Sequence, residues 1–355
     1  MAHKRHLNRR DILKGLSAGF AAAALGGGKL LHADQPAAVQ NPLAKTGGGL
    51  YVNAAGPAKV SLVKGSDRRE IVARALDNIK DDVLAGLRNR KVLIKPNMVQ
   101  TNRPLCATHV DAVRAILDFL TPHVKETILI GESTASRDGT FEGYKNYGYL
   151  ALEKEYNVKL VDLNTMPFVY RYVFGNENRP IPIRIISTFL DPDLYIVSAA
   201  ALKTHDRVLA TLSLKNVLLA APLNDGKNDK GLTHTQDRFQ VNSVLHYNMF
   251  HLAQEIWPDL AVIDGFEGME GNGPVGGTPV DSRVAVASVD PLAADVTAMR
   301  VMGFDPKRIL YMTSMAEAGM GQGDYEKIAL LGTPLEQCLC KFKPARQMIE
   351  PYGFS

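Results

Sequence analysis

The alternation that decides the fold occurs in residues 91–133, which read "KVLIKPNMVQTNRPLCATHVDAVRAILDFLTPHVKETILIGES". The apolar runs at 91–94 and 127–130 are short and are followed by polar residues, as buried strands are. Between them, Val110, Val113 and Leu117 recur at helical spacing. A strand, a helix and a second strand in this order indicate a parallel pair whose connecting helix covers one face of the sheet.

The same alternation continues on both sides of this stretch. Residues 69–79 predict a helix, and 159–163 predict another buried strand. The segments 168–174 and 181–188 flank a turn-rich sequence, which predicts a small antiparallel insertion. Later segments predict buried strands at 193–202, 259–269 and 282–290 and helices at 241–257 and 292–303. A polar, turn-rich loop or lid is predicted at 222–239, and a glycine-rich loop is predicted from Asp264. We therefore predict an α/β fold with a mostly parallel sheet, flanking helices and this insertion.

The N-terminus is typical of an exported protein. Arg9 and Arg10 precede a weakly apolar run rich in alanine and glycine, as in a twin-arginine signal. We predict a signal peptide at 1–33, a flexible linker at 34–57 and one α/β domain at 58–355, so the export machinery is an expected partner and the periplasm the expected compartment. The apolar run is too short for a stable membrane span, which needs about 20 apolar residues, but an uncleaved anchor stays open.

Charge and cysteine content exclude two classes of function. The chain has a net charge of +4, but its first 33 residues carry +5, so the remainder is close to neutral and gives no reason to expect nucleic-acid binding. Three cysteines, at 106, 338 and 340, are too few for an iron–sulfur cluster, which needs about four thiolates. We therefore expect no such cluster.

Polar side chains follow several of the predicted strands. Lys95 and Asn97 follow the run at 91–94, and Glu132 and Ser133 follow the run at 127–130. Ligands of open parallel sheets bind beyond the carboxyl ends of the strands, so we predict a pocket at this edge. The same reasoning places there Lys203, Thr204, His205, Lys215, Asn216, Asp264, Glu267, Glu270, Asn272 and Asp290, and His234 of the turn-rich segment is a further candidate.

The sequence also resembles a known family. The motifs are "KPNMV" at 95–99, "GES" at 131–133, "LKTH" at 202–205, "LKN" at 214–216, "DGFEGMEGNGP" at 264–274 and "VDPLAADVTA" at 289–298. In this order, over roughly 90–305, they resemble the family catalogued as domain of unknown function 362. The resemblance implies no particular reaction. Some members carry an added ferredoxin-like module, whose cysteine runs are absent here.

The residue types suggest two kinds of site. Lys95, Lys203 and Lys215 would repel one another unless an anion or acidic side chains neutralised them. Carboxylates with a histidine and an asparagine would instead suit a divalent cation such as Mg²⁺ or Mn²⁺. A network of internal salt bridges stays open. We predict catalytic roles for His205, Lys203 and Glu267, substrate contacts from Lys95, Asn97, Glu132, Ser133, Thr204, Lys215, Asn216 and Asn272, and metal contacts from Asp264, Glu270 and Asp290.

Our leading hypothesis is an exported enzyme that acts on a small anionic substrate, a carboxylate or a phosphate, with a divalent metal. The alternative is a periplasmic protein that binds an anionic ligand or a redox cofactor without catalysis. The two differ in one property, because an enzyme's site should hold a group that titrates near neutrality within reach of the ligand.

Overall fold

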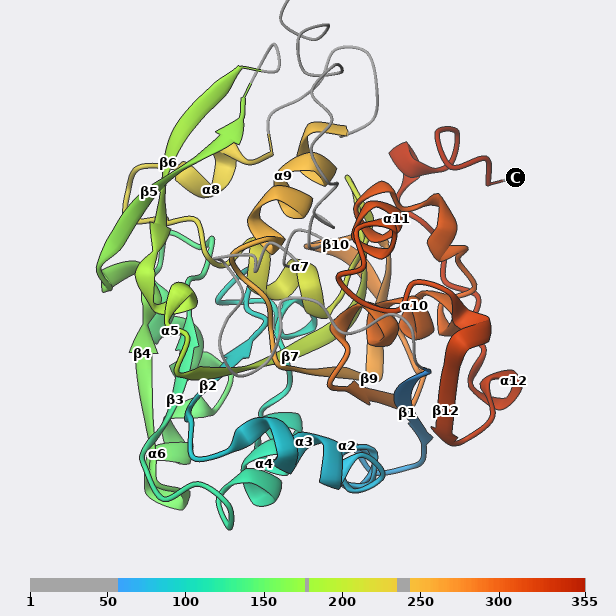
Figure 1. Cartoon of the computed structure of the whole chain (residues 1–355), viewed down its shortest axis with the longest axis horizontal. Coiled ribbons are helices and arrows are strands. Elements are labelled where there is room, and N and C mark those ends of the chain that lie inside the picture. The colour runs from blue at the N-terminus through green and yellow to red at the C-terminus, as the bar shows by residue number, and fades with distance from the viewer. Residues whose placement is uncertain (1–56, 176–178, 235–242, 355) are drawn as a thin grey trace, which may run out of the picture. The chain divides into compact units, whose positions relative to one another are not determined.

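The computed structural model describes residues 57–354, except 176–178 and 235–242, so the predicted signal peptide and almost all of the linker lie outside the described residues. The described residues belong to one compact unit built around a large β-sheet (Figure 1). The strands are β1 (Ala58–Lys64), β2 (Lys91–Pro96), β3 (Ile128–Glu132), β4 (Val158–Asp162), β5 (Phe168–Phe174), β6 (Pro180–Ile186), β7 (Leu194–His205), β8 (Leu209–Thr211), β9 (Leu260–Asn272), β10 (Gly276–Val280), β11 (Val284–Ser288) and β12 (Ile328–Gly332).

The large sheet has the order β12–β1–β11–β9–β7–β2–β3–β4, with β8 added beside β7 and β10 beside β9. Strands β9, β7, β2, β3 and β4 are parallel to one another. Strand β11 runs antiparallel to β9 and to β1. The carboxyl end of β11 therefore lies at the opposite edge of the sheet from the carboxyl ends of the five parallel strands.

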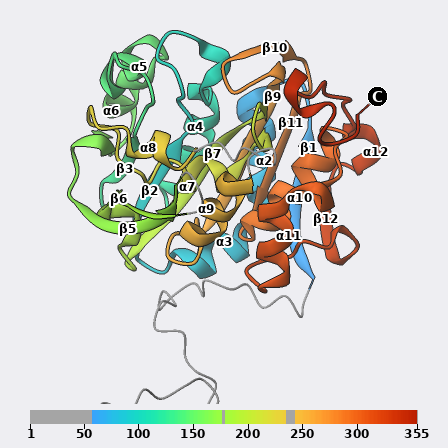
Figure 2. The same cartoon turned by 90° about the horizontal axis from the view of Figure 1, so that it is seen from above.

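Helices cover both faces of the sheet (Figures 1 and 2). Apolar residues of α2, α3 and α4 form one core with the strands, and those of α7, α9, α10 and α11 belong to a second core on the other face. The helices are α2 (Arg68–Asp77), α3 (Lys80–Leu87), α4 (Val110–Leu120), α5 (Thr140–Asn146), α6 (Leu152–Glu155), α7 (Ser213–Leu218), α8 (Asp229–Leu232), α9 (Ser243–Ala253), α10 (Pro291–Val301), α11 (Leu310–Glu317) and α12 (Leu335–Cys338).

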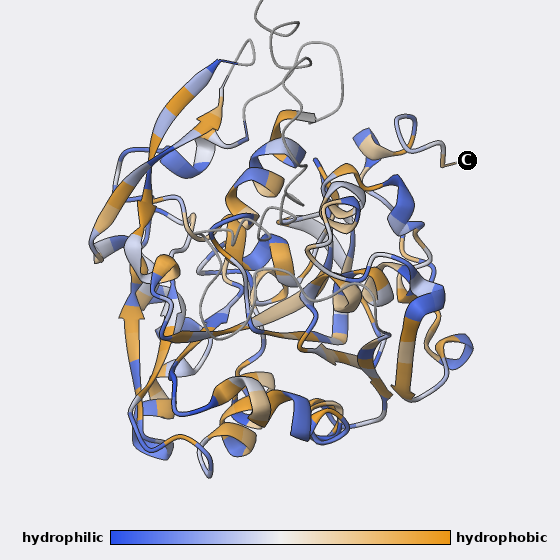
Figure 3. Ribbon diagram, viewed as in Figure 1, coloured by the Kyte–Doolittle hydropathy of each residue, from blue (hydrophilic) through white to orange (hydrophobic). Residues whose placement is uncertain are grey.

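Burial explains why these sequences form these elements. Every residue of β7 is buried, as expected for a central parallel strand covered by helices on both faces. In α4, buried Val113, Ile116 and Leu120 alternate with exposed or half-buried polar residues. Figure 3 accordingly shows both hydrophobic and hydrophilic residues on the helices below the sheet. No helix within the described residues is long and apolar enough to cross a membrane.

The predicted fold class is confirmed. The parallel strands with flanking helices are present, and β5 and β6 form the expected separate antiparallel pair, which packs against α9. Strands β1, β8, β10 and β12 were not predicted. Each of them adds to a sheet that the sequence pattern already indicated, so the architecture is extended rather than changed.

Three local predictions are wrong. Lys203, Thr204 and His205 do not follow a strand that ends at residue 202, because β7 continues through His205 and pairs with β8. The glycine-rich segment is not a loop, because β9 runs on to Asn272 and pairs with β10. The helix predicted to end at Trp257 ends at Ala253. Of the predicted loop or lid at 222–239, the described part contains the short helix α8.

Candidate functional site

The carboxyl ends of β2 and β3 carry a buried ion pair. Lys95 Nζ lies 3.0 Å from Glu132 Oε2, and both side chains are nearly inaccessible to solvent. Lys95 Nζ also donates to Asn216 Oδ1 at 3.0 Å and to the carbonyl oxygen of Pro96 at 2.6 Å. Glu132 Oε1 accepts from the backbone N–H of Ser133 at 2.6 Å. Both charges are thus neutralised locally, as buried charges require.

Two asparagines extend this network, and their amide orientations follow from their partners. Asn216 Nδ2 donates to the carbonyl oxygen of Lys95 at 3.0 Å and to Ser198 Oγ at 3.1 Å. A carbonyl oxygen can only accept, so Asn216 Oδ1 must face Lys95 Nζ and Asn97 Nδ2, which donates to it at 3.1 Å. Asn97 Oδ1 therefore faces away from this network. It is a buried acceptor with no hydrogen-bond partner among the described residues.

Helix α7 is held in place by a carboxylate from α10. Asp295 Oδ1 accepts from the backbone N–H of Ser213 at 2.8 Å, and Asp295 Oδ2 accepts from the N–H of Leu214 at 3.1 Å. Its Oδ1 also accepts from the Ser213 hydroxyl at 2.5 Å. Burial raises the pKa of Asp295 to about 7, although these hydrogen bonds oppose the increase. Asp295 thus fixes the N-terminal turn of the helix that carries Lys215 and Asn216.

Lys215 differs from Lys95 because no carboxylate of the described residues is in ion-pair contact with it, although the charge of Asp206 acts on it from a greater distance. Its side chain is 7% exposed, and its Nζ has no hydrogen-bond or ion-pair partner within the described residues. The pKa of Lys215 falls to about 7, mainly because the side chain is buried and also because of the neighbouring charge of Lys203, while the charge of Asp206 opposes the shift. A large fraction of Lys215 is therefore a neutral amine at neutral pH.

The segment that contains α8 supplies a third lysine and a histidine. Lys230 Nζ donates to the carbonyl oxygen of Ser133 and, at 3.2 Å, to its hydroxyl. His234 Nδ1 lies 2.9 Å from the carbonyl oxygen of Lys230, so Nδ1 carries the proton and Nε2 is the free acceptor. Burial lowers the pKa of His234 to about 3 and that of Lys230 to about 8. Arg184 holds the segment through ion pairs with Asp225 and Asp229.

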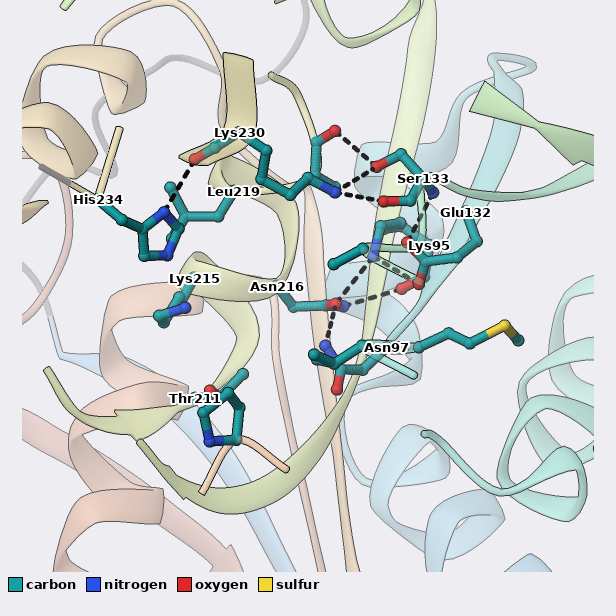
Figure 4. Close-up of a pocket in the computed structure, with 15 residues that line it drawn as sticks. Lys95, Asn97, Glu132, Ser133, Thr211, Lys215, Asn216, Leu219, Lys230 and His234 are labelled. Carbon is teal, nitrogen blue, oxygen red and sulfur yellow. Dashed lines mark hydrogen bonds and ion pairs between the residues drawn. The ribbon is translucent and has the colours of Figure 1, made fainter. Parts of the chain in front are cut away.

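The three lysines, the two asparagines, Glu132, Ser133 and His234 line one cavity of about 100 Å³ (Figure 4). This is well below the roughly 300–1,000 Å³ of sites for drug-sized ligands, so the cavity suits only a small molecule. Thr211 Oγ1, like Asn97 Oδ1, is buried without a hydrogen-bond partner among the described residues. The polar and charged residues of the lining are Lys95, Asn97, Glu132, Ser133, Thr211, Lys215, Asn216, Lys230 and His234.

The predicted residues of β7 lie near this cavity but do not line it. Lys203 Nζ donates to the carbonyl oxygen of Cys106 at 3.3 Å, and burial lowers its pKa to about 8. His205 Nδ1 accepts from the N–H of Arg207 at 3.0 Å, and burial holds the pKa of His205 well below its ordinary value. Thr204 Oγ1 donates to backbone carbonyls of β9, at 2.9 Å for Gly271. Thr204 therefore joins the two strands.

The predicted metal ligands are not brought together. Asp264 pairs with Arg68 at 3.3 Å, and Glu270 accepts from the N–H of Lys343 at 2.8 Å. Asp290 caps α10 and lies at the opposite edge of the sheet, because β11 is antiparallel. Within 57–175, 179–234 and 243–354, no group of three or more His, Cys, Asp or Glu side chains is arranged to hold a metal ion.

Two further predicted residues of β9 also lie apart from the cavity lining. Glu267 is exposed, and Asn272 Oδ1 accepts from the N–H of Arg346 at 3.1 Å. Both predictions assumed a glycine-rich loop beyond the carboxyl end of a strand. As an extended strand, the segment instead carries these side chains along the edge that pairs with β10.

The sequence model of the family described as "Domain of unknown function (DUF362)" matches residues 92–300, which is more than half of the chain. The chain belongs to the DUF362 family. The DUF362 region contains every residue that lines the cavity, together with Asp295.

Two individual proteins resemble parts of this DUF362 chain. The "Thylakoid-associated protein sll1697" of Synechocystis sp. is 27% identical over 256 residues, which cover 71% of this chain and 75% of that protein. A crystal structure of a Thermotoga maritima protein aligns at 13% identity with a TM-score of 0.33, covering 61% of this chain and 55% of that one. This chain thus spans about half the length of the Thermotoga protein.

Of the nine polar and charged residues that line the cavity, seven were candidates from the sequence and two were missed, as was Asp295, which holds α7. Lys95, Asn97, Glu132, Ser133, Lys215 and Asn216 line the cavity, as does His234. Thr211, Lys230 and Asp295 were not singled out. Lys230 lies in a polar segment with several charged residues that gave no reason to prefer it. Asp295 lies in a helix, and only the packing of α10 against α7 shows what it binds.

Proposed function

We propose that the cavity binds a small anionic substrate, a carboxylate or a phosphate, and that the protein is an enzyme acting on it. The observation that carries this proposal is Lys215, a buried lysine that lines the cavity and forms no ion pair or hydrogen bond through its Nζ among the described residues. A buried ammonium without a partner is costly, and a bound anion would supply the partner.

The charges of the lining support an anion. Lys95, Lys215 and Lys230 are its cations, and Glu132 is its carboxylate. Glu132 pairs with Lys95, and neither Lys215 nor Lys230 forms an ion pair with a carboxylate of the lining, although the charge of Glu132 raises the pKa of Lys230. Lys203 adds a further positive charge close enough to lower the pKa of Lys215.

Lys215 also favours an enzyme over the alternative, a binding protein without catalysis. A binding site needs only complementary charge, whereas acid–base or nucleophilic chemistry needs a group that titrates near the working pH. Lys215, with a pKa of about 7, is such a group, and it lines the cavity. In this proposal Lys203 keeps Lys215 partly neutral, and His205 and Glu267 have no contact with substrate. No metal role is included, since Asp264, Glu270 and Asp290 lie apart.

Anion binding can be tested by thermal melting. We expect sodium phosphate or sodium pyruvate to raise the melting temperature of the full-length protein in a concentration-dependent way, because a ligand of the native state stabilises it by mass action. The rise should be larger at pH 6 than at pH 9, since Lys215 and Lys230 carry more positive charge at the lower pH.

The control for this experiment is sodium chloride at matched ionic strength, which should give a smaller rise. Lys215→Met should remove most of the phosphate or pyruvate effect, whereas Lys154→Met, at an exposed position of α6, should leave it unchanged. Equal shifts with chloride, or an undiminished shift in Lys215→Met, would contradict the proposal.

We also propose that the protein is exported in folded form by the twin-arginine route. The support is the sequence of the N-terminus alone, which lies outside the described residues. We expect the double variant Arg9→Lys/Arg10→Lys to remain in the cytoplasm, because the export receptor reads the arginine pair. Cell fractionation would check this. A variant that still reaches the periplasm in undiminished amount would remove the assignment of compartment.

A further inference from the structure

We infer that the substrate is a small carbonyl compound carrying a carboxylate or phosphate group, and that Lys215 Nζ forms an imine with its carbonyl carbon. The inference rests on the proposed function, because it takes the cavity as the substrate site. It adds to that function the group of the protein that reacts, Lys215 Nζ, and the group of the substrate that is attacked, its carbonyl carbon. Three features of the lining support it: the partners of the lysines, the unpaired polar atoms and the position of the second cation.

Lys215 is the lysine of the lining that is free to react. Lys95 is held by Glu132, Asn216 and the carbonyl oxygen of Pro96, all of which stabilise its protonated form. Lys230 donates to the carbonyl oxygen and hydroxyl of Ser133. Lys215 has no such acceptor among the described residues. A lysine desolvated beside other cations is a good amine nucleophile, because its neutral form is favoured.

The unpaired polar atoms suit a ligand that donates a hydrogen bond as well as carrying negative charge. Asn97 Oδ1 is a buried acceptor whose orientation is fixed by Asn216. An ionised carboxylate placed beside it would leave it unpaired, because carboxylate oxygens only accept. A hydroxyl of the ligand would pair it. The hydroxyl of a carbinolamine, the first product of amine addition to a carbonyl, is such a donor.

Thr211 and Lys230 complete the arrangement. In Figure 4, Lys215 and Thr211 lie on one side of the cavity, and Ser133, Glu132 and Lys95 lie on the other. The hydroxyl of Thr211 has no partner among the described residues and is available to donate to the carbonyl oxygen. Lys230 lines the same cavity and supplies positive charge for the carboxylate or phosphate.

The covalent step is balanced by these groups and water. The lone pair of neutral Lys215 Nζ forms the C–N bond, the electrons of the C=O π bond move to oxygen, and one amine proton is transferred to that oxygen. The resulting hydroxyl then leaves as water after taking a proton from the ammonium of Lys230, which solvent reprotonates. The nitrogen lone pair forms the C=N bond, and the product is a protonated imine. No oxidant or reductant is needed.

Reductive trapping tests the inference. The full-length protein is incubated with pyruvate or dihydroxyacetone phosphate and sodium cyanoborohydride, and intact mass and peptide mass spectrometry locate the adduct. We expect one reduced adduct, at Lys215. Its formation at pH 7 should exceed that at exposed Lys154 by roughly 100-fold, because the pKa of Lys215 near 7 leaves about half of its amine neutral and reactive at this pH.

The controls separate this reaction from surface labelling. Acetone, which has the carbonyl but no anion, should label Lys215 more slowly than pyruvate. Lactate, which has the carboxylate but no carbonyl, should give no adduct and should protect Lys215 from pyruvate. Lys215→Arg should lose the adduct and Lys154→Arg should keep it, and the lactate protection in the wild type gives the same answer if Lys215→Arg does not fold.

The outcomes distinguish the two proposals. Absence of an adduct at Lys215 with both carbonyl compounds, or labelling that is equal at Lys154 and unaffected by lactate, overturns the imine. If phosphate and pyruvate nevertheless raise the melting temperature through Lys215, the proposed anion site stands and only the covalent step is lost. If neither compound stabilises the protein and no adduct forms, both proposals fail.

Discussion

Lys215→Met should raise the free energy of unfolding of the ligand-free protein at pH 6, by up to about 5 kcal/mol. The wild-type fold must bury a lysine whose pKa falls from 10.5 to about 7, and each unit of pKa shift corresponds to about 1.36 kcal/mol. Methionine fills a similar volume without charge, and it removes the repulsion of Lys203 and Lys230.

The pH dependence of this gain has a definite sign. The folded-state pKa of Lys215 is about 7 and lies below its ordinary value of 10.5, so between these values the unfolded chain binds more protons than the folded one. The loss of folding free energy caused by burying Lys215 in the wild type therefore has its full size below pH 7 and decreases as the pH rises toward 10.5. The advantage of Lys215→Met should shrink over the same range.

Urea denaturation of wild type and variant at pH 6, 8 and 10 would measure the effect. Lys154→Met is the matched control, because it removes a lysine at an exposed position and should change the free energy of unfolding by less than about 0.5 kcal/mol. A loss of stability in Lys215→Met at pH 6 would mean that Lys215 has a stabilising partner. It would count against the anion site and the imine together.

Lys95→Met should have the opposite effect and destabilise the fold by roughly 3–5 kcal/mol, because it leaves the buried carboxylate of Glu132 without its cation. It also removes a hydrogen-bond donor from Asn216 Oδ1. Glu132→Gln should be costly for the complementary reason, since it leaves a buried ammonium. The double variant Lys95→Met/Glu132→Gln should lose clearly less than the sum of the single variants.

Urea denaturation of the two single variants and the double variant gives the coupling energy of this pair. The exposed ion pair between Lys59 and Asp82 is the matched comparison, and its cycle should give about 0–1 kcal/mol. A coupling energy near zero for Lys95 and Glu132 would show that the pair does not hold the two strand ends together, and that the network around Asn216 does not depend on it.

The sequence was sufficient for the parallel part of the sheet because its strands are short apolar runs separated by amphipathic helices. It was less informative where strands contain charges or glycines. Lys203 and His205 suggested that β7 had ended, but pairing with β8 and β9 keeps the strand continuous. The glycines of β9 suggested a loop, yet its pairing with β10 satisfies the backbone of that segment.

The candidate site was predicted only where an apolar run of the sequence marks the end of a strand. The ends of β2 and β3 follow directly from where apolar runs stop, so Lys95 and Glu132 were placed correctly at the edge. Asp290 was not, because nothing in its own strand indicates that β11 runs antiparallel to β9. The orientations of Asn97 and Asn216 depend on hydrogen bonds that join β2, β7 and α7, and no local pattern encodes them.

The capping of α7 by Asp295 has a consequence for how the protein is made. All residues that line the cavity lie between 95 and 274. The carboxylate that fixes α7, the helix that carries Lys215 and Asn216, belongs to residue 295. During translation from the N-terminus, the whole lining leaves the ribosome before its anchor does. The first 274 residues therefore hold every residue that lines the cavity, while the pocket acquires its final shape only after α10 has been synthesised and has packed on the nascent domain.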